Sequence, residues 1–531
     1  MSNTKQRHGR TDYYIAGEGF VADSKAFAAP RTAIALESIE GSPSVEDALP
    51  GETTRAFRFC RMFPDLLAFR PDDAGLINLG KTMSDDRDTL SADSHIPSGF
   101  TYLGQFVDHD ITFDRTVGIP DGMLDPAEIV QGRTPSLELD SLYGRGPSLS
   151  AELYEVDGMR LKIGVTTGRP DFGVTATFSN DLPRRPSDDP SNPKQAILGD
   201  PRNDENLIVA QTHVAFIKFH NRVIEFLRTE GTSPIDLFEA ARKIVVQHYQ
   251  SIVLYDLVRR LVDPSIFDDV LKNGRRFFLP NQKPERSALC MPVEFSVAAY
   301  RLGHSLVRNN YEWNRVFNST GITQADLGLF FTFSQVSGDL GGEPALPSDW
   351  IVDWRRMYDF SEQPGGSRHP QLNFTRPLDT HLARKLKGLP EFASANPQDL
   401  KSLAVRNLLR GRLVGLPTGQ DVASKFCVAP LTPAEIASGP NAVLISDLQF
   451  DKKTPLWFYI LKEAEVRHSG EHLGEVGSRI IVETFHAIVE GSDFSILAES
   501  NWKTTLPSEF ANHFTMNELL LFVNDLNPIG D

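Results

Sequence analysis

The chain has 531 residues, of which 40% are hydrophobic and 23% are charged, a composition typical of a globular protein with a large core. The formal net charge of −16 would repel a polyanion, so nucleic acid is excluded as an expected partner. Three widely spaced cysteines without a Cys-x-x-Cys pair exclude a zinc knuckle and a fold held by many disulfides, but they allow one disulfide bond.

The N-terminal segment, residues 1–90, is predicted to form an arm or wrap, and residues 91–531 a single large domain. Residues 1–14 are polar and charged and lack the apolar stretch of a signal peptide. No run of 18 apolar residues occurs anywhere in the chain. We therefore expect no membrane span, and a location either in the cytoplasm or outside the cell after leaderless export.

The segment 102–113 places three chemically active side chains on one predicted helical face. Gln105, Asp108 and His109 are three and four residues apart, so they point to roughly the same side. Asp110 is turned away from His109 by about 100° and is expected to serve a different site. Taken alone, the pattern also fits a helix with solvated polar residues.

Residues 116–200 are rich in Pro, Gly, Asp and Ser and predict long irregular loops. Within them, four oxygen-bearing residues alternate at period two: Thr134, Ser136, Glu138 and Asp140. In an extended segment alternate side chains face the same way, and oxygen ligands suit a hard cation such as calcium. An ordinary polar loop would show the same pattern.

A long helix is predicted over residues 206–227, directly after Arg202 and Glu205. These two residues are three apart and can face the same side, which also fits a surface ion pair. His213 and His220 lie two turns apart on the apolar face of the helix. We expect both histidines to be hydrogen-bonded core residues rather than metal ligands.

Further helices are predicted from helical periodicity over residues 234–261, 293–307, 400–412 and 479–489. Thr432 and Glu435 form a capping box that predicts another helix start. Strand signals are few and short. The sequence therefore predicts a mainly α fold, a single large helical domain with long irregular loops and few short strands.

Five segments between about residues 95 and 430 resemble, in the same order, segments of the animal haem peroxidases, which belong to the peroxidase–cyclooxygenase superfamily. The chain resembles a stand-alone, bacterial-like member of this family that is related to myeloperoxidase and lactoperoxidase. The segments are Gln-x-x-Asp-His-Asp at 105–110, the loop ending in Tyr-Gly at 143–144, Arg-x-x-Glu at 202–205, Arg-x-Gly-His at 301–304 and the stretch 405–417. The resemblance implies that residues 91–531 form a catalytic domain.

On the distal side, the resemblance implies that His109 is the catalytic acid and base and Arg202 the catalytic arginine. Gln105 would hydrogen-bond the distal water or halide. Asp108 and Glu205 would form ester bonds to a haem b derivative.

The resemblance also implies a calcium site. Its ligands would be Asp110, Thr134, Ser136 through its carbonyl, Glu138 and Asp140. Glu138 and Asp140 replace the Asp and Ser more usual in the family, and both replacements keep oxygen donors.

On the proximal side, the resemblance assigns His304 as the ligand of the haem iron. Asn407 would accept a hydrogen bond from this histidine and so orient its ring. Arg301 and Arg410 would contact the cofactor, Arg410 at a propionate group.

The implied function is a haem peroxidase that reduces hydrogen peroxide and oxidises halides, thiocyanate or small phenolic donors through a ferryl intermediate. A fatty-acid dioxygenase of the same superfamily would need a radical-forming tyrosine at position 301, where this chain has Arg301, and Tyr300 is one residue off. A haem-bearing adhesion protein and an inactive scaffold remain as alternatives. The chain contains no Arg-Gly-Asp, and the intact His109, Arg202 and His304 argue against an inactive scaffold.

Overall fold

The computed structural model describes residues 57–85, 93–114, 124–186, 188, 194–280, 290–320, 325–390, 395 and 398–531. Within these residues the fold is mainly helical with a few short strands, as the sequence predicts. The longer helices are α2 (Asp73–Thr82), α3 (Gly99–Ile111), α5 (Leu207–Thr229), α6 (Leu237–Ser251), α8 (Pro264–Asn273), α12 (Leu403–Leu413), α16 (Leu456–His468), α17 (Glu475–Glu490) and α18 (Met516–Val523).

The shorter helices connect and cover these elements. They are α4 (Asp140–Tyr143), α7 (Arg259–Leu261), α9 (Gly303–Leu306), α10 (Leu327–Thr332), α11 (Gln335–Gly338), α13 (Gly419–Lys425), α14 (Pro433–Ile436) and α15 (Ala442–Asp447).

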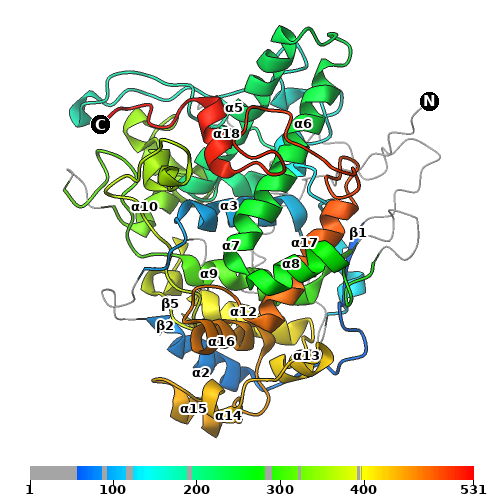
Figure 1. Cartoon of the computed structure of the whole chain (residues 1–531). Coiled ribbons are helices and arrows are strands. Elements are labelled where there is room, and N and C mark those ends of the chain that lie inside the picture. Colours follow the sequence, from blue (N-terminus) through cyan, green and yellow to red (C-terminus); the bar gives the residue numbers. More distant parts are fainter. Residues whose placement is uncertain are drawn as a thin grey trace.

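Helix α3 lies in the middle of the molecule, where it packs against α5 and α9 (Figure 1). Most residues of α3 are buried, on nearly every face of the helix, as is typical of a helix in the interior of a large protein. Phe106 stacks on Phe216 of α5 with ring centroids 4.8 Å apart, and it meets Tyr249 of α6 edge to face. This aromatic contact fixes the rotation of α3, and with it the direction of the polar residues that follow Phe106.

The segment predicted as helical over residues 293–307 is helical, but it is not one continuous α-helix. The structure has a π-helical turn at Glu294–Ala298, a 3-10 turn at Ala299–Leu302 and then α9. A second π-helical run, Ile252–Val258, joins α6 to α7 inside the segment predicted as one helix over 234–261. Apolar periodicity alone does not distinguish these windings from an α-helix, because they differ by one hydrogen-bond step.

Several other predictions are confirmed. Helices α5, α12 and α17 cover the predicted segments 206–227, 400–412 and 479–489. Thr432 and Glu435 make the reciprocal capping box at the start of α14. The described part of residues 116–200 consists of loops with short helical turns. Periodicity did not reveal α2, α8 or α16.

Two small sheets join distant parts of the chain. Strand β1 (Phe57–Cys60) pairs antiparallel with β3 (Val130–Gln131) and parallel with β4 (Cys290–Pro292). Strand β2 (Ser84–Asp85) pairs parallel with β5 (Leu382–Ala383). Helix α2 packs against α12 in the lower part of Figure 1. Residues 57–85 of the segment predicted as an N-terminal arm therefore pair and pack with later parts of the chain.

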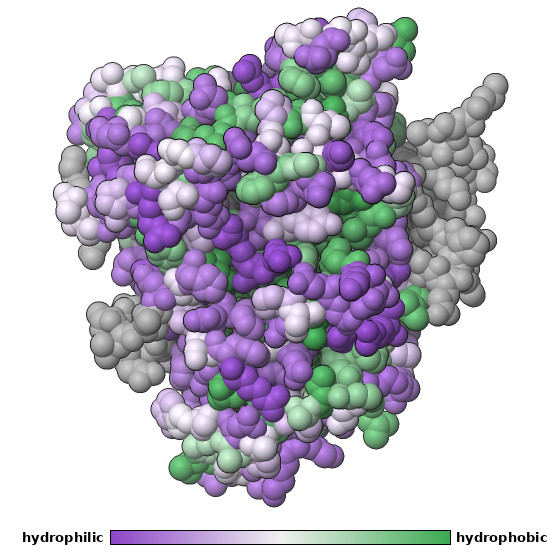
Figure 2. Space-filling model, in the orientation of Figure 1, coloured by the Kyte–Doolittle hydropathy of each residue, from purple (hydrophilic) through white to green (hydrophobic). Residues whose placement is uncertain are grey.

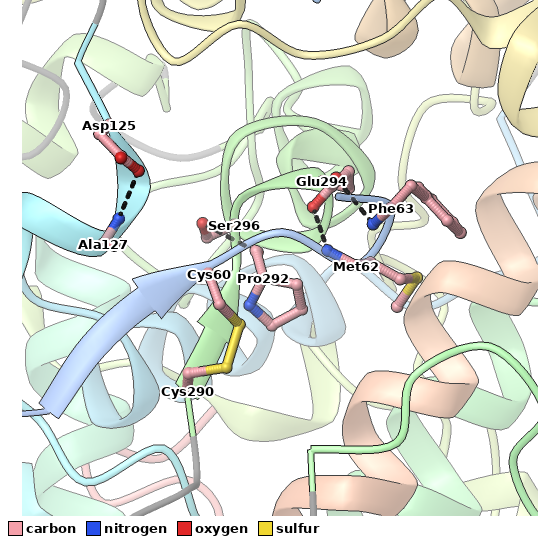
Figure 3. The surroundings of a disulfide bond; sticks show 9 residues. All are labelled: Cys60, Met62, Phe63, Asp125, Ala127, Cys290, Pro292, Glu294 and Ser296. Carbon is pink, nitrogen blue, oxygen red and sulfur yellow. Dashed lines mark hydrogen bonds between the residues drawn. A yellow bond between two sulfur atoms is a disulfide. The ribbon is translucent and has the colours of Figure 1, made fainter. Parts of the chain in front are cut away.

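A disulfide between Cys60 and Cys290 covalently joins β1 to β4 (Figure 3). It is the one disulfide bond that the cysteine count allows. Beside it, the buried carboxylate of Glu294 accepts hydrogen bonds from the backbone N–H groups of Met62 and Phe63, at 2.8 and 3.3 Å. The disulfide and Glu294 thus anchor the chain after β1 to the segment that leads to α9.

Replacing Cys60 and Cys290 together by alanine is expected to lower the free energy of unfolding by about 2–4 kcal/mol, because the bridge closes a long loop. The two residues are 230 positions apart in sequence. Thermal unfolding followed by circular dichroism measures the effect. Cys427→Ala is the matched control, since Cys427 is exposed and free, and it should leave the midpoint unchanged. Equal midpoints for the double variant and the unmodified protein would contradict the prediction.

The visible face is mostly hydrophilic, with smaller apolar patches between polar side chains (Figure 2). Among the described residues, no helix combines the length and the apolar character needed to cross a membrane.

Candidate active site

A cavity of about 200 Å³ lies between α3, the segment Glu294–Leu306 and α12. All nine residues predicted as catalytic or cofactor-binding line it: Gln105, Asp108, His109, Arg202, Glu205, Arg301, His304, Asn407 and Arg410. Apolar side chains, among them Val297, Leu306 and Phe331, complete the walls. The fold therefore gathers residues that lie up to about 300 positions apart.

His109 is buried and held by a chain of side-chain hydrogen bonds. Its Nδ1 lies 2.8 Å from Asn203 Oδ1, and Asn203 Nδ2 lies 2.9 Å from His213 Nδ1. The amide oxygen can only accept, so Nδ1 of His109 carries a proton and Nε2 keeps a lone pair. Burial and the nearby Arg202 lower the pKa of His109 to about 3. A neutral base therefore stands in the cavity at physiological pH.

Arg202 belongs to a 3-10 turn, Pro201–Asp204, and its guanidinium is fixed from several sides. It bonds Asp200 at 2.8 Å and the backbone carbonyls of His109 and Thr112 at 3.0 and 2.7 Å. The guanidinium carbon also lies over the ring of Phe113, 4.6 Å from the ring centroid. A permanently charged cation is thus locked beside His109.

Asp200 also forms an ion pair with Arg133, which donates to the carbonyl of His109 as well. Burial alone would raise the pKa of Asp200, but the two guanidinium groups hold it below its ordinary value. This buried carboxylate balances the positive charge that the arginines bring to the cavity wall.

The two predicted ester carboxylates both line the cavity. Thr112 Oγ1 donates to Asp108 Oδ1 at 3.0 Å, and burial raises the pKa of Asp108. The side chain of Glu205 is buried and lies beside Arg202, where their charges interact. Asn206, the N-cap of α5, donates to Gln105 Oε1 at 3.0 Å and thereby orients the amide of Gln105.

A second wall carries His304, the second residue of α9. Its Nδ1 lies 2.7 Å from Nδ2 of Asn407. With the amide of Asn407 turned by 180°, its oxygen would accept from Nδ1–H, and Nε2 of His304 would keep a lone pair. Burial and Arg301 lower the pKa of His304 to about 3, so this imidazole is neutral and suited to bind a metal.

Two half-buried arginine side chains lie along this wall and repel each other. Arg301 donates from Nε to the carbonyl of Ser296 at 2.9 Å, and Arg410 pairs with Asp114 at 2.7 Å. Burial and Arg410 lower the pKa of Arg301 to about 9. An anionic group bound between the two arginines would relieve this repulsion.

The residues predicted to bind calcium are all buried. Asp110 points away from the cavity and accepts from the backbone N–H groups of Leu139 and Ser141, at 3.1 and 3.2 Å. Burial and Asp140 raise the pKa of Asp110 to about 8. Asp140 in turn accepts from the N–H of Thr134 at 3.0 Å. A cation near these two carboxylates would remove their repulsion.

The carboxylate of Glu138 also contacts the segment that follows α17. Its Oε1 accepts hydrogen bonds from Ser492 Oγ at 2.7 Å and from the N–H of Asp493 at 2.9 Å. The period-two pattern assumed an extended segment. The structure instead has bends over residues 135–138 and a positive φ of 58° at Leu139.

The sequence did not single out Asn203, Asn206 or Asp200 as members of the site. His213 and His220 are buried and hydrogen-bonded, as predicted: His220 contacts the hydroxyl of Tyr143 at 3.0 Å. No local pattern in the sequence announces that Asn203 bridges His109 and His213, because the three residues meet only after α3 and α5 have packed.

Comparisons with known proteins agree with this geometry. The family model of the animal haem peroxidases matches residues 108–503. Human thyroid peroxidase is 24% identical over 350 residues, which are 61% of this chain and 33% of the relative. A peroxidasin homologue of Caenorhabditis elegans is 23% identical over 380 residues, 68% of this chain and 26% of the relative. The chain spans between 12% and 33% of the length of the curated relatives it matches.

Two solved structures share the fold. Peroxidase A from Dictyostelium discoideum superposes with a TM-score of 0.60 at 15% identity, over 90% of this chain and 94% of that chain. Fatty acid alpha-dioxygenase from Oryza sativa superposes with a TM-score of 0.51 at 13% identity, over 86% of this chain and 77% of that chain. At these identities the likeness concerns the fold alone.

Proposed function

Because this chain belongs to the animal haem peroxidase family, within the peroxidase–cyclooxygenase superfamily, we propose that it binds haem in the cavity and uses hydrogen peroxide to oxidise small donor molecules. One observation carries the proposal. A neutral histidine and a fixed arginine, His109 and Arg202, share one cavity with a second neutral histidine, His304, on a different wall.

The residues of the cavity fit a haem group. The neutral His304 offers an imidazole nitrogen to iron, as expected of a proximal ligand. Apolar walls suit a porphyrin, and Arg301 and Arg410 suit its carboxylate side groups. Asn407 would orient His304 through Nδ1, and such second partners tune a metal ligand.

The side chains on the His109 side of the cavity supply the proton chemistry. When bound, haem would supply the redox-active iron centre for the reduction of peroxide and the oxidation of donors. His109 takes the proton from one peroxide oxygen at Nε2 and returns it to the other, which then leaves as water. Arg202 stabilises the negative charge that develops on the leaving oxygen. Asn203 holds Nδ1–H of His109 and so keeps Nε2 available throughout.

Halides, thiocyanate and small phenols are the proposed donors, and Gln105 would hydrogen-bond a water or halide near His109. A spectroscopic experiment tests the function. The haem-loaded protein is mixed with one equivalent of hydrogen peroxide, and a donor is then added. We expect the Soret band to shift within milliseconds and to return with iodide, thiocyanate or guaiacol. A Soret band that peroxide leaves unchanged would point to an inactive scaffold or an adhesion-type protein.

A fatty-acid dioxygenase is the second candidate, because Tyr300 lines the same cavity and donates from its hydroxyl to the carbonyl of Gly104 at 3.2 Å. Oxygen uptake with palmitate separates the two functions. Uptake that depends on Tyr300 would favour the dioxygenase. A peroxidase would not consume dissolved oxygen when palmitate is added.

We propose ester bonds from Asp108 and Glu205 to the haem, since both carboxylates line the cavity. Acidified butanone should leave the haem on the unmodified protein and extract it from a double variant, Asp108→Ala with Glu205→Ala. Complete extraction from the unmodified protein would rule out ester bonds.

We also propose a calcium ion near Asp110 and Asp140, with Thr134 and the carbonyl of Ser136 as further oxygen ligands. The mutual repulsion of the two buried carboxylates supports this proposal. Glu138 is proposed as a further ligand, and its Oε1 also accepts hydrogen bonds from Ser492 and Asp493.

The rate of reaction with peroxide should stay nearly constant from pH 8 down to pH 5. The pKa of His109 is lowered to about 3, so its neutral, proton-accepting form persists in acid. A histidine with an ordinary pKa of about 6.5 would be only about 3% neutral at pH 5. Stopped-flow rate constants across this range measure the profile. A loss of rate centred near pH 6.5 would contradict the proposed environment of His109.

A further inference from the structure

Outside the cavity, three potential metal ligands from different segments lie together: Asp263, His468 and His472. Asp263 precedes α8, His468 ends α16, and His472 lies in the connection between α16 and α17 (Figure 1). One ligand atom of each lies within 4.8 Å of the others, and none of the three residues lines the cavity. We propose that these side chains bind a divalent transition-metal ion of the zinc type.

The donor set fits such an ion. Two imidazoles and one carboxylate are the ligands of many zinc sites that keep a fourth position for water. Imidazole also favours zinc over calcium or magnesium. In a zinc tetrahedron with bonds of about 2.0–2.1 Å, ligand atoms are roughly 3.3 Å apart. Small side-chain rotations of the three half-buried residues would close the present spacing to that value.

Asp263 is oriented by its role at the start of α8. Its Oδ1 accepts from the N–H groups of Ser265 and Ile266, at 2.8 and 3.3 Å, and from Ser265 Oγ at 2.5 Å. All of these bonds fall on Oδ1, so Oδ2 remains for a metal. The carboxylate therefore needs little ordering when an ion binds.

The two histidines are brought together by a tight reversal of the chain. Ser469 and Gly470 both have positive φ, 53° and 74°, which turns the chain sharply after α16. The rings of His468 and His472 then lie with centroids 4.3 Å apart. His472 Nδ1 lies 2.8 Å from the carbonyl of Leu473, to which only an Nδ1–H can donate. Its Nε2 consequently carries a lone pair, the arrangement common in metal-binding histidines.

A hydrogen-bonded frame connects the two segments behind the ligands. The N–H of Asp263 donates to Ser478 Oγ at 2.8 Å, and that hydroxyl donates to the carbonyl of Leu473 at 3.0 Å. The N–H of Leu473 donates to the carbonyl of Leu261 at 2.9 Å. Ser478 and Leu473 are both fully buried, so water does not compete for these bonds. The nearest arginine on α16, Arg467, pairs with Glu435 and Glu475 instead.

A second cluster of potential metal ligands occurs among the described residues. Asp353, His369 and Asp531 also lie within 4.8 Å of one another. However, the guanidinium of Arg355 forms ion pairs with both carboxylates and already neutralises them. This second cluster therefore supplies the matched control, since it has similar residues and a cation in place.

Zinc titration of the haem-loaded protein tests the proposal, after chelator dialysis and in excess calcium to saturate oxygen-ligand sites. Calorimetry should show one zinc ion per chain. His472→Ala, and a double variant with His468→Ala as well, should bind zinc at least about 100-fold more weakly. Asp263→Asn should weaken binding while keeping the helix cap, because asparagine caps helices well. His369→Gln should bind like the unmodified protein, and the Soret band should stay unchanged in every variant.

Equal zinc binding by the unmodified protein and by the double histidine variant would overturn the proposal. So would loss of the site in His369→Gln. If a histidine variant fails to fold, X-ray absorption at the zinc edge of the unmodified protein decides the matter. Two imidazole ligands support the site, and a spectrum without imidazole overturns it.

Discussion

Replacing His109 by alanine is expected to slow the reaction with hydrogen peroxide by about 10²–10⁴-fold, the usual contribution of general acid–base catalysis. His109 is the neutral base of the cavity, since burial and Arg202 lower its pKa to about 3. Without it, peroxide must lose its proton to water and regain one from water at the leaving oxygen. The second-order rate constant from stopped-flow absorption measures the effect.

Two further measurements make the His109 experiment specific. The variant should keep its haem and its Soret band, because His304 stands on a different wall. Asn203→Ala should lower the rate less than His109→Ala, because it removes the partner that fixes the Nδ1 proton and keeps the base. A His109→Ala protein that reacts with peroxide at the unmodified rate would refute the role of His109.

The second large effect is expected from His304→Ala, which should weaken haem binding by at least about 100-fold, since loss of even a partner of a metal ligand costs 10–100-fold. His304 is the neutral imidazole that the fold presents with Asn407 behind it. The Soret absorbance per chain after gel filtration measures the loss. If ester bonds retain the haem, the loss of the proximal ligand appears as a shifted Soret band instead.

Imidazole added to the His304→Ala protein should restore the original spectrum, because the deleted ring leaves space in the cavity for a free imidazole. Asn407→Ala should keep the haem and change the spectrum only slightly, since the ligand itself remains. His248 supplies a control, because it is buried and its pKa is lowered to about 4, yet it does not line the cavity. A spectrum of His304→Ala that matches the unmodified protein would show that another residue binds the iron.

The experiments at His109 and His304 test different halves of the proposal. A failure at His109 with success at His304 would leave a haem protein whose peroxide chemistry uses another base. A failure at His304 would question the haem site itself. Neither result touches the zinc site, whose ligands lie outside the cavity.

The sequence by itself determined the fold class and the family, and it named nine residues that line the cavity. Long amphipathic segments such as 206–227 predicted helices because hydrophobic periodicity is a local property. The order of Gln105, Asp108, His109, Arg202 and the later segments indicated the family, since these residue types at these spacings are written in the chain.

Only the tertiary structure decided how these residues act together. The bond from Asn203 to His109 and the approach of Arg301 to Arg410 depend on how helices pack, so no local pattern contains them. The pairing of Cys60 with Cys290 depends likewise on strand register across 230 residues.

Local patterns also did not supply two finer features of the backbone. The helical segment 293–307 contains three different windings, and the loop that carries Glu138 is bent rather than extended. The cluster of Asp263 and the two histidines of the α16–α17 connection forms through a buried hydrogen-bond frame. Local spacing fixes which side chains share a face of one element, whereas packing between elements fixes which faces meet.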